Sequence, residues 1–155
     1  MITNAMRLLQ AAKIPFDTAE YTVDESDLSG VHAAEQLGVD PDCVFKTLVT
    51  KGEKHGPHVF CIPVAYELDL RKCAQAAGEK KLEMLHVKDL PGLTGYVRGG
   101  CSPVGMKKKF PTTIDETALL CERIYVSAGA RGHQLILAPE TLAEYVGATF
   151  RDVLL

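Results

Sequence analysis

Hydrophobic positions recur along the chain at two different intervals, and together they predict many short elements. Spacings of three and four predict helices over residues 3–13, 29–38, 69–77 and 139–146. Alternating or β-branched runs predict strands over residues 16–23, 43–51, 58–65, 81–87, 122–127, 134–138 and 148–153. The helices are short and do not follow each strand in turn, which excludes a doubly wound fold. We expect a mixed α/β fold (α+β) in which short helices surround a twisted, partly closed mixed β-sheet.

Turn residues separate the predicted elements. Gly52–Pro57 has the composition of a hairpin turn between two of the strands. Ser29 and Gly38 flank one helix as a typical N-cap and C-cap, and Pro91-Gly92 predicts a turn. No linker, low-complexity stretch or internal repeat interrupts the pattern, so we expect a single domain over residues 1–155.

Composition and charge narrow the class of protein. Of the 155 residues, 46% are hydrophobic and 24% are charged, which supplies a core and argues against disorder. No apolar run approaches the ~20 residues that a membrane span needs, and no basic and apolar leader opens the chain, so we expect a soluble, cytoplasmic protein without membrane contacts. The net charge of −3 gives no general attraction to nucleic acid, so any RNA contact must be local or shared with a partner.

The cysteines predict free thiols. There are five of them, an odd number, widely spaced and without a Cys-x-x-Cys pair: Cys43, Cys61, Cys73, Cys101 and Cys121. This pattern disfavours a disulfide framework and a zinc site, so we expect reduced thiols.

Lys46 is the sharpest single candidate for a functional residue. Strand alternation puts its side chain on the same face as Val44 and Leu48. An ammonium group on an apolar face is unfavourable unless it is paired or points into a polar cleft. The alternative interpretation is that Phe45, Thr47 and Val49 form the core face and that Lys46 faces solvent.

The segment from Gly95 to Phe110 is rich in glycine and is suited to presenting its backbone to a ligand. Gly99, Gly100 and Pro103 would form a stiff loop whose N–H groups can approach a phosphate, a ribose or a carbonyl oxygen. A nucleotide-binding P-loop is excluded, because the lysine is displaced and the following Ser or Thr is absent.

Two further interpretations of this segment stay open. Cys101 or Ser102 would be a nucleophile, but the Gly-x-Ser-x-Gly elbow that supports such a role is absent. In the second interpretation, the backbone N–H groups of the loop bind a carbonyl or its oxyanion, and no protein nucleophile is needed. A plain structural turn explains the composition equally well. Lys107, Lys108 and Lys109, which follow, would form a solvated face or meet a nucleic-acid backbone.

A second glycine-bearing turn runs from Ser127 to His133. Arg131 in this turn would bind a phosphate or carboxylate, and His133 would act as an acid or base. A hairpin with two solvated polar residues is the alternative. His55 and His58 lack the spacing of a metal site, so no metal is expected.

Three ordered motifs give the chain a resemblance to a known family: Val44–Val49, Thr94–Gly105 and Tyr125–Gly132. In these motifs the sequence resembles the YbaK family, free-standing relatives of the editing domain of bacterial prolyl-tRNA synthetases. The resemblance spans nearly the whole chain. It implies the fold of the YbaK and prolyl-tRNA synthetase editing domains, with a pocket for the 3′ aminoacyl-adenosine of a mischarged tRNA.

The same resemblance implies roles for individual residues. Lys46 would be the essential lysine that orients the terminal nucleotide or the acyl ester, and Gly99–Pro103 would hold the aminoacyl carbonyl. The implied substrate-binding residues are Tyr21, Ser127, Gly129, Arg131, Gly132 and His133, and the implied tRNA contacts are Lys107, Lys108 and Lys109. The chain departs from the family at Ala128 and Ala130, where the common turn is Ser-Gly-Gly-Lys-Arg-Gly, so a lysine contact is absent. No carboxylate role can be transferred to Gln134.

The resemblance implies deacylation of Cys-tRNA(Pro). Cysteine and proline are similar in volume, so a size sieve cannot separate them and chemical selection is needed. The substrate's own thiol would attack its ester, with prolyl-tRNA synthetase as a transient partner and no cofactor. The alternatives are an Ala-tRNA(Pro) deacylase that uses activated water and a non-catalytic module that binds aminoacyl-tRNA or a nucleotide.

Overall fold

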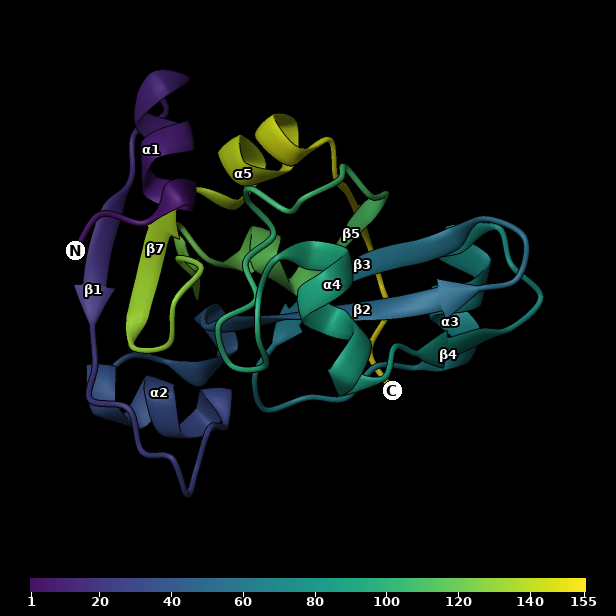
Figure 1. Cartoon of the computed structure of the whole chain (residues 1–155), viewed down its shortest axis with the longest axis horizontal. Coiled ribbons are helices and arrows are strands. Elements are labelled where there is room, and N and C mark those ends of the chain that lie inside the picture. The colour runs from purple at the N-terminus through teal and green to yellow at the C-terminus, as the bar shows by residue number, and fades with distance from the viewer.

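Two separate β-sheets, with short helices around them, form the centre of the molecule (Figure 1). The computed structural model describes all residues from Met1 to Leu155. The strands are β1 Asp17–Glu20, β2 Phe45–Gly52, β3 Gly56–Pro63, β4 Leu82–Met84, β5 Thr112–Asp115, β6 Ile124–Ser127, β7 His133–Leu137 and β8 Thr149–Arg151. The α-helices are α1 Asn4–Ala11, α2 Gly30–Leu37, α3 Leu70–Ala77, α4 Leu90–Thr94 and α5 Pro139–Val146, and the 3-10 helices are η1 Pro41–Cys43, η2 Val87–Asp89 and η3 Glu116–Leu120.

The strand order confirms a mixed α/β fold, although the sheets are not closed. The small sheet has the order β1-β7-β6 and is antiparallel throughout. The large sheet has the order β4-β2-β3-β5-β8, with antiparallel pairs around β2 and parallel pairs on both sides of β5. A single parallel bridge, from Val44 to Tyr125, joins them. The chain therefore forms two open sheets instead of one partly closed sheet.

The predicted caps and hairpin are confirmed. Ser29 accepts a hydrogen bond from the backbone N–H of His32 at the start of α2, and Gly38 ends that helix with φ 66°. Strands β2 and β3 pair along their whole length, from Phe45 opposite Pro63 to Gly52 opposite Gly56. Local sequence signals are thus sufficient for these elements.

Two predictions in the middle of the chain were wrong or incomplete. Pro91 and Gly92 lie inside helix α4, because proline fits the first turn of a helix, where its missing N–H has no partner to lose. Strand β5 was not predicted, since Thr112, Thr113 and Asp115 hide any apolar alternation, yet all four of its residues are buried.

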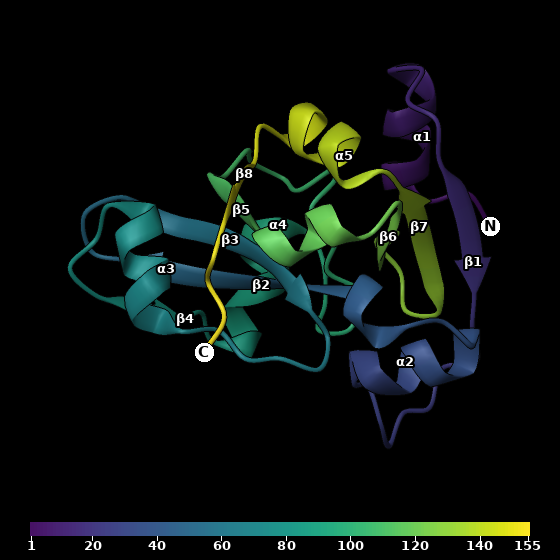
Figure 2. The ribbon, with the colours of Figure 1, turned by 180° about the vertical axis from the view of Figure 1, so that it is seen from behind.

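Strand β3 is buried on both faces, which places it at the centre of the molecule. Val59 and Cys61 belong to the main core, whereas Phe60 and Ile62 belong to a second core that includes Cys73 of α3. Helices α3 and α4 cover opposite faces of the large sheet (Figures 1 and 2). One face of this sheet is thus closed by α3, and the other is turned toward α4 and the glycine-rich segment.

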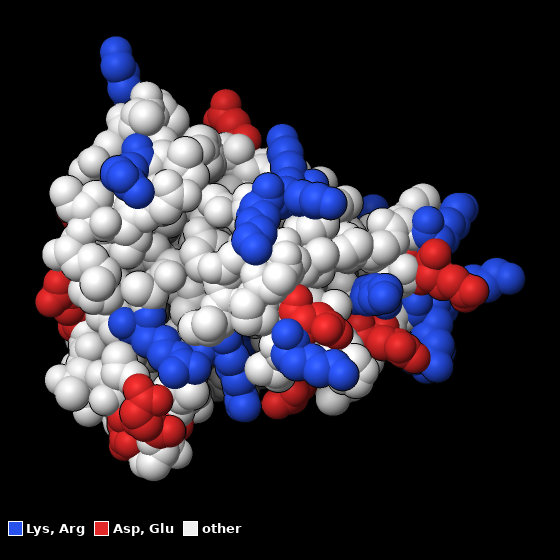
Figure 3. Space-filling model, viewed as in Figure 1, with Lys and Arg blue, Asp and Glu red and all other residues white.

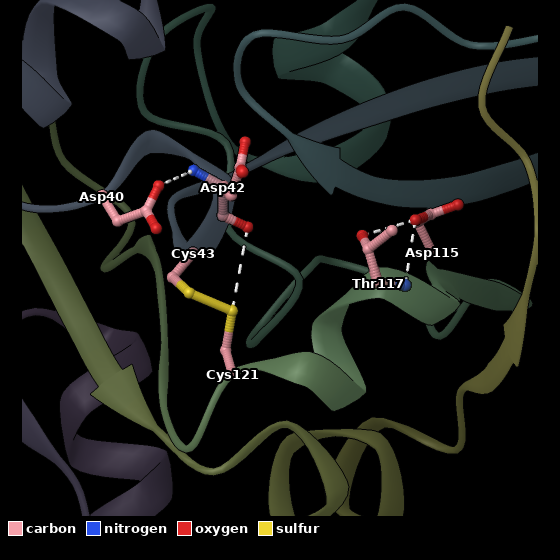
Figure 4. The surroundings of a disulfide bond; sticks show 6 residues. All are labelled: Asp40, Asp42, Cys43, Asp115, Thr117 and Cys121. Carbon is pink, nitrogen blue, oxygen red and sulfur yellow. Dashed lines mark hydrogen bonds between the residues drawn. A yellow bond between two sulfur atoms is a disulfide. The ribbon is translucent and has the colours of Figure 1, made fainter.

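The expectation of five free thiols was wrong. Cys43 and Cys121 form a disulfide that joins η1 to the end of η3, across a sequence separation of 78 (Figure 4). Their Cα atoms lie 6.0 Å apart. The sequence could not reveal the pair, because only the packing of η3 beside the start of β2 brings the two residues together. Cys61, Cys73 and Cys101 are free and buried.

Figure 4 also shows why η3 begins where it does. The buried carboxylate of Asp115 accepts hydrogen bonds from the backbone N–H and the hydroxyl of Thr117, and it accepts a third from the backbone N–H of Val153. Asp115 therefore ties the large sheet to the C-terminal segment.

None of the helices is long and apolar enough to span a membrane.

Candidate active site

A cavity of about 360 Å³ lies along an unpaired stretch of strand β2. Strand β4 pairs with β2 only from Thr50 to Gly52, and Val44 bridges to Tyr125. Between these points one edge of β2 has no neighbouring strand, and the cavity fills this gap. The start of α2, the glycine-rich segment and the facing ends of β6 and β7 complete its wall.

Lys46 lines this cavity, and its position resolves the two interpretations of the strand pattern. Phe45 and Val49 lie in the main core. By strand alternation Phe45, Thr47 and Val49 therefore form the core face, as in the alternative interpretation. Lys46 nevertheless reaches the cavity, because the cavity lies at the open edge of the strand. Its side chain is half-buried and forms none of the salt bridges of the chain. The ammonium group is therefore available to a ligand.

The glycine-rich loop lines the same cavity and carries two backbone N–H groups without an acceptor in the chain. Gly99 and Cys101 line it, and their N–H groups donate to no acceptor within the chain. The N–H of Gly100 already donates to the carbonyl of Val97 at 3.0 Å. Gly99 has φ 83°, a conformation that favours glycine. Two unpaired donors in a partly apolar cavity suit a developing negative charge.

Gly100 is required for close packing between the two predicted glycine turns. A Cβ atom on Gly100 would lie 3.3 Å from the backbone nitrogen of Arg131. The loop thus packs closely against the backbone of the second turn.

Burial argues against both proposed protein nucleophiles. Cys101 is 6% exposed, and desolvation raises the pKa of its thiol to about 12, so the thiol stays protonated near neutral pH. Ser102 is fully buried outside the cavity, and its hydroxyl oxygen accepts a hydrogen bond from the N–H of Val104. Pro103 also lies outside the cavity and lines a different hollow of the surface.

Ser127 and Gln134 form the opposite wall. They are paired across β6 and β7, so their side chains share one face of the small sheet, and both line the cavity. The hydroxyl oxygen of Ser127 accepts from the N–H of Gly129 at 3.1 Å, which leaves its proton free for a ligand. The Oε1 atom of Gln134 is buried without a partner. Such an unsatisfied group is typical of a binding site.

The remaining residues of the second turn lie away from the cavity. Arg131 donates from Nε to the carbonyl of Arg98 at 2.9 Å and forms an ion pair with Glu25, so it holds two loops together. His133 follows strand alternation onto the other face from Gln134, where its Nδ1 lies 3.6 Å from Glu20. The structure therefore does not bring His133 to the cavity as an acid or base.

Gly129 and Gly132 in this turn are packing residues. A Cβ atom on Gly129 would lie 2.9 Å from the ring of Tyr96, and one on Gly132 would lie 2.9 Å from the carbonyl oxygen of Tyr21. Tyr21 itself lines the cavity, as expected. Its N–H donates to the carbonyl of Gly132, which ties the end of β1 to the turn.

The charge of the cavity wall is positive. Arg98, which sequence reasoning did not single out, lines the cavity together with Lys46, and no Asp, Glu or His does so. Lys107–Lys109 lie apart, in the loop between α4 and β5, where a group of basic side chains stands on the surface in Figure 3. Lys108 and Lys109 line a separate hollow of about 290 Å³. Both basic regions suit an anionic ligand.

Comparisons with known proteins show which family the chain belongs to. A family model described as the aminoacyl-tRNA editing domain matches residues 28–145. The chain belongs to this family. It is 50% identical, over 97% of its length and 92% of the relative, to EbsC of Enterococcus faecalis, a proposed Cys-tRNA(Pro)/Cys-tRNA(Cys) deacylase. The resemblance to the YbaK family and the expectation of an aminoacyl-tRNA deacylase are thus confirmed.

Solved structures show the same editing-domain fold. The structure of a proposed trans-editing enzyme for prolyl-tRNA synthetase is 25% identical, with a TM-score of 0.84 over 100% of this chain and 99% of that one. The hypothetical protein APE2540 is 23% identical, with a TM-score of 0.87 over 96% of this chain and 97% of that one. The second likeness concerns the fold alone. The editing-domain fold predicted from the motifs is therefore confirmed.

Proposed function

We propose that this editing-domain protein removes cysteine from mischarged Cys-tRNA(Pro). The proposal is supported by the identity to EbsC and by the likeness to a proposed trans-editing enzyme for prolyl-tRNA synthetase. One observation carries the mechanism: no Asp, Glu or His lines the cavity. Hydrolysis by activated water most often uses His, Asp or Glu as the general base, so their absence from the cavity wall favours a nucleophile that the substrate itself provides.

The reaction begins with the thiol of the cysteinyl group, which attacks its own ester carbonyl. A sulfur–carbon bond forms, the bond from that carbon to the ribose oxygen breaks, and the thiol proton passes to the ribose oxygen. The products are tRNA with a free terminal hydroxyl and a small cyclic thioester that later hydrolyses. The N–H groups of Gly99 and Cys101 stabilise the oxyanion of the intermediate.

The remaining polar groups of the cavity position the substrate. Lys46 holds the acyl ester or the terminal nucleotide with its free ammonium group, and the hydroxyl of Ser127 donates to the aminoacyl group. Tyr21 lines the cavity beside them. Alanine is also small enough to enter such a site, but it has no thiol, so hydrolysis of its ester would depend on water activated by a general base.

Recognition of tRNA is shared between this protein and a partner. The net charge of −3 limits the affinity for a whole tRNA, so contacts are confined to the acceptor end, through Lys107, Lys108 and Lys109. Prolyl-tRNA synthetase, as a transient partner, supplies selectivity for tRNA(Pro). The protein then acts in the cytoplasm, where that synthetase works.

The test is single-turnover deacylation of Cys-, Ser- and Ala-tRNA(Pro) by the wild type and by Lys46→Ala. Cysteine and serine differ at one atom, so their comparison isolates the thiol. We expect rapid loss of the cysteinyl ester, little loss of the other two, and at least a hundredfold slower reaction in Lys46→Ala. A preference for alanine would overturn the thiol mechanism, and no turnover of any substrate would favour a non-catalytic binding module.

A further inference from the structure

Tyr96 is a half-buried tyrosine that the proposed reaction does not use. It precedes the glycine-rich loop and does not line the cavity. Its hydroxyl donates a hydrogen bond to the backbone carbonyl of Val104, which lies eight residues further along the chain. The segment between them includes Gly99 and Cys101, whose N–H groups have no acceptor in the chain. The side chain of Tyr96 therefore closes the loop that carries these two N–H groups.

Both ends of this hydrogen bond are held in place. The hydroxyl of Thr94 accepts a hydrogen bond from the N–H of Tyr96 at 3.0 Å and donates one to the carbonyl of Leu90 at 2.7 Å. At the other end, the N–H of Val104 donates to the hydroxyl oxygen of Ser102 at 3.2 Å. Thr94 and Val104 are fully buried. The side chain of Tyr96 thus joins two fixed points of the chain.

The ring of Tyr96 also packs against the second glycine turn. A Cβ atom on Gly129 would lie 2.9 Å from Cε1 of the ring, so a glycine is needed for this close approach. The N–H of Gly129 donates to the hydroxyl oxygen of Ser127, which lines the cavity. Tyr96 therefore contacts both parts of the chain to which the proposed mechanism assigns hydrogen-bond donors, the glycine-rich loop and the turn beside Ser127.

The hydroxyl of Tyr96 lies in a closely packed place. A Cβ atom on Gly105 would lie 2.9 Å from its oxygen and 3.0 Å from the side chain of Leu8 in helix α1. The carbonyl of Val104 is its only hydrogen-bond partner in the chain. Burial raises the pKa of this hydroxyl to about 12, so it stays protonated near neutral pH. Its donation to Val104 therefore does not depend on pH near neutrality.

We propose that Tyr96 is a positioning residue, which holds the N–H groups of Gly99 and Cys101 in place relative to the hydroxyl of Ser127. This inference rests on the proposed function and names a residue on which the chemical step depends. Donors stabilise an oxyanion best when they are already fixed around the place where its charge develops. A looser loop therefore lowers the rate of the chemical step more than it lowers the affinity for substrate.

The test compares the wild type with Tyr96→Phe, which keeps the ring and removes the hydroxyl. Thr117→Val is the matched control, because it removes a hydroxyl that donates to Asp115 outside the cavity. Single-turnover deacylation of Cys-tRNA(Pro) at increasing protein concentration gives the maximal rate and the half-saturating concentration. Nitrogen-15 relaxation of the Gly99 and Cys101 amides gives their order parameters, and thermal unfolding gives the stability of each variant.

We expect Tyr96→Phe to lower the maximal rate about tenfold, as for the loss of one hydrogen bond, and to leave the half-saturating concentration within about twofold. The order parameters of the two amides should fall in this variant. Thr117→Val should lose stability but keep the wild-type rate and order parameters.

Three results would overturn the proposal: a wild-type rate in Tyr96→Phe, an equal loss of rate in Thr117→Val, or unchanged order parameters in Tyr96→Phe. The relaxation measurement needs no substrate, so it tests the positioning of the loop independently of turnover. Absence of deacylation by the wild type would instead overturn the proposed function, and the two failures are therefore distinguishable.

Discussion

At Cys101, burial decides the chemistry of a residue that the sequence left open as a nucleophile. Its pKa of about 12 keeps the thiol neutral, so it cannot supply a thiolate at physiological pH. We therefore predict that Cys101→Ala deacylates Cys-tRNA(Pro) within about threefold of the wild-type rate in single-turnover assays. A loss as large as that of Lys46→Ala would show that this thiol takes part in the reaction.

The same residue makes stability depend on pH in the alkaline range. Burial raises the pKa of Cys101 from 9.0 to about 12, so between these values the unfolded chain loses the proton while the folded chain keeps it. The free energy of unfolding should therefore fall as pH rises above about 9, with up to ~1.4 kcal/mol per pH unit from this group. Urea unfolding at several pH values from 8 to 11 should give a shallower fall for Cys101→Ala. Parallel curves for the two proteins would contradict this.

Single residues also show what the sequence could and could not predict. Lys46 was predicted because a charge inside a strand pattern is locally visible, and the structure brings it to the cavity. Arg98 was missed and Gln134 was left without a role, since neither residue type stands out in a polar loop or an apolar strand. Their positions depend on pairing between β6 and β7 and on the packing of two loops, which are long-range contacts.

At the scale of elements, the proposed mechanism depends on the conformation of the glycine-rich loop. Gly99 has φ 83°, and alanine in that conformation costs roughly 1–2 kcal/mol. We predict that Gly99→Ala lowers the free energy of unfolding by about that amount. It should also slow deacylation strongly, because the adjacent N–H groups change direction.

Gly92 provides the matched control for this prediction. It lies in α4, where a Cβ atom would meet nothing within 4 Å, so Gly92→Ala should keep full activity and be neutral or slightly stabilising. Urea unfolding and single-turnover rates should therefore show a loss of stability and activity for Gly99→Ala and no loss of either for Gly92→Ala. Equal activity of the two would mean that the loop conformation is not critical.

Elements with local signals were predicted well, and those defined by distant contacts were not. The caps of α2 and the β2–β3 hairpin depend on residues close in sequence, and both were predicted. Strand β5 depends on parallel pairing with β3 and β8, which are remote in the chain. Its threonines and aspartate carry no pattern that would reveal a buried central strand.

At the scale of the whole molecule, the Cys43–Cys121 disulfide links the start of β2 to the segment before β6. It closes a loop with a sequence separation of 78, for which the chain-entropy estimate of stabilisation is about 4.5 kcal/mol. We predict that the Cys43→Ser, Cys121→Ser double variant unfolds at lower urea concentration than the oxidised wild type. Reduction of the wild type should have the same effect. An unchanged midpoint would show that the bond adds no stability.

The central claim is that the thiol of the substrate replaces a catalytic group of the protein, and it can be tested by blocking that thiol. Wild-type protein should deacylate Cys-tRNA(Pro) rapidly under single-turnover conditions, and methylation of the cysteinyl sulfur should slow the reaction at least a hundredfold. The methylated substrate should still bind, which is measured as its inhibition of the reaction of the unmodified substrate. Retained binding would show that the slower rate comes from the missing thiol and not from poor binding. Equal rates for the two substrates would contradict the account and would show that the protein activates water instead.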